Sequence, residues 1–150
     1  MPNGRIAKSS TWIRVHIVYP LVPFFLDGII RFITSGYSIN LKTFSPATLA
    51  MSLAILCIFV NQSILTKNPT IPNAQDREDL LGAASQFMTY AFFGVGGFCI
   101  IVLLHALKEF HNMNIDSIVE GFACAVYVLS IMPIINAIRA QRSFKLRTTT

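Results

Sequence analysis

The chain has 150 residues, of which 53% are apolar and only 13% are charged, and its mean hydropathy is +0.58. Because soluble proteins carry about 25% charged residues, this composition excludes an ordinary soluble domain and predicts an all-α integral membrane protein. The net charge of +5 is modest, and the three cysteines lack any paired spacing that would indicate disulfides or metal ligands. This length allows one membrane domain, residues 1–150, and no separate soluble domain.

The first predicted span covers residues 12–34, which is long enough at about 1.5 Å per residue to cross a hydrocarbon core of about 30 Å. We expect the chain to retain it, because no small-residue cleavage site follows it. Pro20 and Pro23 remove backbone donors in its first half, so we expect a kinked first helix. Asp27 and Arg31 are four residues apart and predict an intramembrane charge pair. This pair either faces a cavity and carries function, or is a structural ion pair at an interface.

The second predicted span covers residues 47–66 and contains a series of small or polar residues at spacings of three and four. In lipid there is no hydrophobic drive between helices, so small side chains that let two backbones approach are typical of a packing face. We therefore favour helix packing over pore lining for this series, which we call the small-residue seam. Its members are Ala47, Ala50, Ala54, Cys57 and Asn61.

The third predicted span covers residues 79–108 and follows a polar connection whose last residues are mostly acidic. Acids in a first turn suit the positive end of the helix dipole, so they indicate a helix start. Gly94, Gly96 and Gly97 lie together in its middle. Close helix contact is the favoured interpretation of these glycines, but a flexible point and the lining of a lumen both stay open.

His105 and Glu109 form a second pair at a spacing of four, near the end of the third span. A histidine beside an acid at a membrane edge can titrate near neutrality, so this pair is a candidate pH-sensitive element. The simpler interpretation, which we favour, is a polar cap at the membrane interface.

The fourth predicted span covers residues 117–138. Gly121 and Ala125 extend the expected packing surface, and Pro133 predicts a second kink. The remaining residues, 139–150, form a basic tail without acids, which should attract anionic lipid and could bind an acidic protein surface. Its basic residues are Arg139, Arg142, Lys145 and Arg147.

The distribution of charge predicts the topology. With four spans, both termini and the loop between the second and third spans share one side, which holds nine of the twelve lysines and arginines. Under the positive-inside rule both termini are then cytoplasmic, and a bacterial inner membrane is the expected location.

Catalytic, nucleotide-binding and metal-binding motifs are absent from the sequence. We therefore expect a non-enzymatic protein without a cofactor or metal. The basic residues occur where topology requires them and are not interleaved with aromatics, so nucleic acid is not an expected partner.

The outline of four spans with both ends inside and a basic tail is similar to the colicin-A-type immunity proteins. It also resembles the membrane subunit of the two-component Kiwa anti-phage system. The second resemblance implies a homo-oligomer with a cytoplasmic effector as its partner, and neither assigns any site residue. We expect an oligomeric membrane scaffold or sensor in bacterial defence; the alternative is a homo-oligomeric ion channel or pore.

Overall fold

The computed structural model describes residues 9–37, 43–67, 74–111 and 115–144. Within these ranges its regular secondary structure is entirely helical, without strands. The four apolar helices of the described part are each long and apolar enough to cross a membrane. This confirms the predicted all-helical fold with four apolar helices. They cover Ser10–Thr34, Pro46–Thr66, Ala74–Phe110 and Asp116–Phe144.

The first apolar helix consists of three consecutive helical segments. Pro20 lies at the start of the third, and the Tyr19 N–H before it donates to the carbonyl of Arg14, five residues back. This wider π-helical turn suits a proline, whose ring would clash with the carbonyl four residues back in an ordinary α-helix. The expected kink stays a prediction, and the observed feature is this change of helix type. The segments are α1 (Ser9–Ile13), η1 (Arg14–Val18) and α2 (Tyr19–Thr34).

The other helices are α3 (Pro46–Lys67), α4 (Ala74–His111) and α5 (Asp116–Phe144). The 38 residues of α4 give a length of about 57 Å, well beyond a hydrocarbon core of about 30 Å. Helix α5 continues to Phe144, so the first part of the predicted basic tail is helical rather than a free segment.

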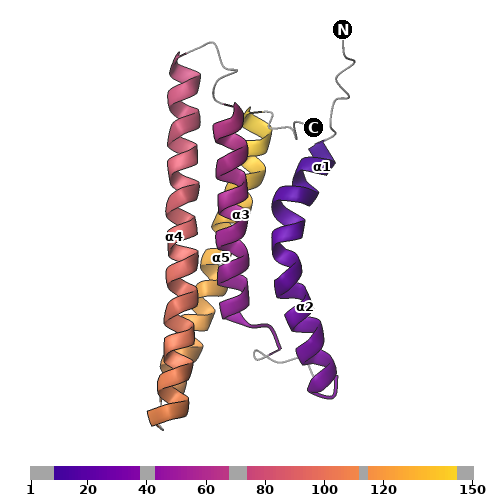
Figure 1. Ribbon diagram of the computed structural model, residues 1–150, viewed down its shortest axis with the longest axis vertical. Coiled ribbons are helices and arrows are strands. Elements are labelled where there is room, and N and C mark those ends of the chain that lie inside the picture. The colour runs from indigo at the N-terminus through magenta and orange to yellow at the C-terminus, as the bar shows by residue number, and fades with distance from the viewer. Residues whose placement is uncertain (1–8, 38–42, 68–73, 112–114, 145–150) are drawn as a thin grey trace.

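Helix α3 is the centre of the arrangement (Figure 1). It packs against α4 along one side and against η1 and α2 on the other, and α5 crosses behind it to contact both α3 and α4. The start of α1 and the end of α5 lie at the same end of the bundle. Because α3 contacts every other long helix, the residues on its faces hold the fold together.

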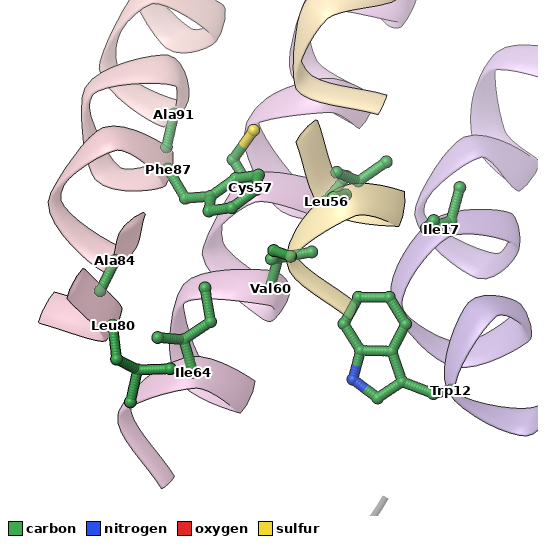
Figure 2. Close-up of a cluster of buried hydrophobic side chains, with 12 residues drawn as sticks. Trp12, Ile17, Leu56, Cys57, Val60, Ile64, Leu80, Ala84, Phe87 and Ala91 are labelled. Carbon is green, nitrogen blue, oxygen red and sulfur yellow. The ribbon is translucent and has the colours of Figure 1, made fainter. Parts of the chain in front are cut away.

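A buried apolar cluster fills the end of the bundle that contains α1 (Figure 2). Trp12 of α1 is fully buried beside the α3 side chains, and Leu80 and Phe87 of α4 pack against the same helix. Three of the α3 members, Leu56, Val60 and Ile64, lie four residues apart and so share a face. The fourth, Cys57, directly follows Leu56 and is three residues before Val60.

The outer surfaces of the bundle are strongly apolar. Ile30 of α2 is 60% exposed, Phe93 of α4 is 75% exposed and Leu129 of α5 is 63% exposed. Many other large apolar side chains on these three helices are also exposed. Such continuous apolar surface is unfavourable in water and is typical of a surface that lipid or a partner covers.

Candidate functional site

A polar contact between α2 and α3 is centred on the carboxylate of Asp27. The Arg31 Nε lies 3.0 Å from each carboxylate oxygen of Asp27. The Thr48 hydroxyl of α3 donates to the same carboxylate at 3.2 Å. The exposed fractions of the side chains are 27% for Asp27 and 50% for Arg31. The acid therefore joins its own helix to the first turn of α3 and remains partly accessible.

The residues just before α3 complete this contact. The ring of Phe44 lies against Gly28 of α2, so closely that a Cβ on Gly28 would come within 2.3 Å of it. The hydroxyl of Tyr127 on α5 donates to the carbonyl of Phe44. Ser45 caps α3, since its Oγ accepts the N–H of Thr48 at 3.3 Å. Three helices thus meet at the start of α3.

A second polar contact joins α1, the first segment of the same apolar helix, to α3 at the end of the bundle that contains α1. The indole N–H of Trp12 donates to the Ser63 hydroxyl of α3 at 2.8 Å. The ring of His16 stacks on the indole with centroids 4.6 Å apart. Sequence reasoning missed this contact, and the available signal was that Trp12 is the single tryptophan of the chain.

The small-residue seam lies mainly between α3 and α4 of one chain. A Cβ on Gly94 would be 2.8 Å from the carbonyl oxygen of Ala50 and 3.0 Å from the Cβ of Ala54. The two helices therefore approach as closely as a glycine allows. Ala50, Ala54 and Cys57 are buried, whereas Ala47 and Asn61 are partly buried.

The other two glycines of α4 differ from Gly94. A Cβ on Gly97 would make ordinary contact with the Ala50 Cβ at 3.8 Å, and one on Gly96 would enter open space. The Asn61 amide lies 4.0 Å from the sulfur of Met88 on α4. Close approach is therefore concentrated at one of the three glycines that the sequence singled out.

Helix α5 packs through a different face from the one that the sequence suggested. Gly121 and Ala125 are exposed, and a Cβ on Gly121 would have nothing within 4 Å. Asn136 contributes a polar contact, since its amide donates to the Tyr90 hydroxyl of α4 at 2.9 Å. Gln86 donates to the same hydroxyl at 2.8 Å. The buried face of α5 consists of Ser130, Pro133, Ala137, Ala140 and Gln141.

The predicted partners His105 and Glu109 do not meet in the part of the chain that the structure describes. The His105 ring hydrogen-bonds with the Ile101 carbonyl one turn back, at 2.9 Å. Lys108 instead pairs with Asp116 and so links the end of α4 to the start of α5. Sequence reasoning missed this ion pair because its partners are on different helices.

Among the predicted basic residues, Arg139 and Arg142 are exposed on the last turns of α5, and Lys145 and Arg147 lie outside the described residues. Within the described ranges no three His, Cys, Asp or Glu side chains are grouped as a metal site requires.

Comparisons with protein-family models, with curated proteins and with solved structures find no match to this chain.

Proposed function

We propose that the chain is an integral membrane protein whose four apolar helices span a bacterial inner membrane, with both termini in the cytoplasm. The exposed apolar surfaces of α2, α4 and α5 support insertion, since lipid would cover them. The orientation is supported by the nine lysines and arginines assigned to the side of the termini. The Kiwa and colicin-immunity resemblances support a setting in bacterial defence.

Within that membrane, we propose a non-enzymatic, oligomeric scaffold or sensor that recruits a cytoplasmic protein. The observation that carries this choice is the apolar packing of the bundle interior around Trp12, Leu56 and Phe87. A pore needs a continuous polar lining, whereas the described polar side chains form separate contacts between helices. The interior therefore supports a scaffold over a pore within one chain.

The recruiting surface proposed here is the end of α5. Arg139 and Arg142 are exposed on its last turns, where each can attract anionic lipid by about 1 kcal/mol or pair with an acidic partner. Lys145 and Arg147 add two charges in sequence. An acidic surface on a cytoplasmic protein fits this charge.

Because the small-residue seam is occupied within one chain, a second copy would bind elsewhere. Gly121 and Ala125 are exposed on α5 and separated by one helical turn, a spacing that lets two helices approach. Gly121→Leu should lower the mass of the detergent-solubilised assembly without unfolding the chain, since its site is open. Gly82→Leu, at another open position, is the matched control. Equal masses for both variants would contradict the use of this surface.

The decisive experiment is to isolate the protein from its native membrane and identify what co-purifies. We expect a stoichiometric cytoplasmic protein that is lost when Arg139, Arg142, Lys145 and Arg147 are all changed to Gln. Lys108→Gln, which removes a charge at the opposite end of the bundle, should leave the complex intact. Selective currents from the purified protein in planar bilayers, with no co-purifying protein, would instead establish the pore.

A further inference from the structure

The start of α3 lies well inside the bundle rather than at its end. Thr48, which contacts Asp27, is the third residue of α3, whereas Asp27 is seven residues before the end of α2. Tyr127, which contacts Phe44, is eleven residues after the start of α5. At 1.5 Å per residue these offsets are about 10 Å along α2 and about 16 Å along α5. Figure 1 shows α3 beginning above the lower ends of α2 and α4.

When the chain is inserted in a membrane as proposed above, these offsets give the depth of the Asp27 contact in that membrane. The ion pair of Lys108 and Asp116 joins the lower ends of α4 and α5 and indicates the level of one membrane surface. The two offsets, about 10 Å along α2 and about 16 Å along α5, place the site between one third of the way and the middle of a core of about 30 Å. At the same height on α5, Val128 is 61% exposed and Leu129 is 63% exposed, as suits a surface facing lipid.

Two features of this site are incompatible with contact to lipid. The partly exposed charges of Asp27 and Arg31 would be costly against hydrocarbon. The chain at Thr43–Ser45 is not helical. Irregular backbone occurs at membrane depth only where protein buries it or where it lines water. Thr43 is buried, whereas Phe44 is 36% exposed and Ser45 is partly buried, so protein encloses only part of this segment.

We propose that water enters the bundle from the end opposite the termini and reaches Asp27. Asp27, Arg31, Thr48 and the Phe44 carbonyl then form a hydrated site at membrane depth that admits water and small hydrophilic solutes. Toward the termini the packed side chains of the apolar cluster close it. The site is therefore open on one side only. If the protein is a sensor, solvent on the side opposite the termini can reach the groups that hold α2 against α3 through this site.

Cysteine accessibility tests this proposal in the full chain after Cys57, Cys99 and Cys124 are changed to Ala. Single cysteines replace Arg31 or Thr48 in the site, and Ile30 or Leu129 at similar heights on outer faces. A membrane-impermeant charged thiol reagent is added to intact cells. Because only a hydrated thiol ionises and meets the reagent, we expect the two site cysteines to react at least about tenfold faster. Each site variant keeps the other contact to Asp27.

Phe110→Cys reports insertion and orientation independently, since Phe110 is 80% exposed near the end of α4. If it reacts but the site cysteines do not, the site is dry and the proposal is wrong, whereas the proposed insertion stands. If Ile30→Cys and Leu129→Cys react as fast as the site cysteines, this level lies at the membrane surface and the proposal is also wrong. Reaction of Phe110→Cys only in inverted vesicles would overturn the proposed topology. In that case the reaction rates of the site cysteines and the outer-face cysteines are compared in inverted vesicles, and equal rates there would contradict the hydrated site.

Discussion

Helix α3 is held in two different ways by α4 and by the first apolar helix, which lie on either side of it in Figure 1. Against α4 the backbones themselves approach, with Gly94 placed over Ala50 and Ala54. Against the first apolar helix the polar contacts are separate side-chain pairs, one at the start of that helix and one seven residues before its end. These are Trp12 with Ser63, and Asp27 with Thr48.

The two interfaces therefore differ in how they can fail. Close backbone packing is a continuous surface of van der Waals contacts, so any added volume separates both helices along their length. Side-chain contacts can be removed one at a time, and each loss is local. We infer that α3 and α4 form the rigid part of the molecule and that α2 is the part whose position can be adjusted.

The largest effect should follow from Gly94→Leu. The new side chain has no space, because even a Cβ would lie 2.8 Å from the Ala50 carbonyl oxygen. We expect a loss of about 3 kcal/mol in the free energy of unfolding, at the upper end for overpacking. Titration with denaturing detergent measures it. Gly96→Leu, which enters open space, should change it by less than about 0.5 kcal/mol. Equal losses would show that the close approach of Gly94 to α3 is not the cause.

Gly28→Ala should have a smaller and more local effect. The added methyl meets the Phe44 ring at 2.3 Å, and a ring can move where a backbone carbonyl cannot. We expect about 2 kcal/mol of destabilisation. Hydrogen exchange should show loss of protection in α2 while α4 is unchanged. In a chain that already carries Phe44→Ala, Gly28→Ala should cost little, and an unchanged cost would contradict the ring as its cause.

Asp27→Asn should cost less again. It removes the charge that Arg31 pairs with, and this pair is half exposed on the arginine side. We expect a coupling of about 0.5 to 1 kcal/mol in a double-mutant cycle with Arg31→Gln. The single change should therefore destabilise the protein more than the double change. Additive losses would mean that the pair makes no net contribution.

The smallest effect should come from the amide contact between α5 and α4. Tyr90→Phe removes the hydroxyl to which Asn136 and Gln86 donate. Hydrogen bonds between membrane helices average about 0.6 kcal/mol, so we expect a loss of that size. Thermal unfolding in detergent, with Tyr19→Phe as the control at an exposed position, measures it. A loss above about 2 kcal/mol would indicate that Asn136 cannot find another partner.

The parts that could be predicted from sequence are those that one helix determines alone. Composition and hydropathy were sufficient for four apolar helices. Asp27 and Arg31 are within reach because helix geometry places residues four apart on one face. His105 and Glu109 have the same spacing, yet the described structure joins neither to the other. The spacing of two residues on a helix therefore shows which side chains can form a contact. The neighbouring groups determine which of these contacts form.

The parts that could not be predicted depend on the register between helices. Which of Gly94, Gly96 and Gly97 contacts α3 follows from how far α4 is shifted along α3 and rotated about its own axis. The sequence of a single helix determines neither this shift nor this rotation. The same holds for Thr48 beside Asp27 and for Ser63 beside Trp12, whose partners are 21 and 51 residues away.

The π-helical turn of η1 has a consequence for how this helix tolerates insertions and deletions. Trp12 and Ile17 are both buried although they are five residues apart, a spacing that would rotate one of them off the shared face in a regular α-helix. The turn behaves as one inserted residue. Deleting Val15 would keep both side chains on the inner face but would bring Pro20 into conflict with the carbonyl one turn before it. A shorter homologous chain should therefore lack both the extra residue and the proline, and the two changes should be inherited together.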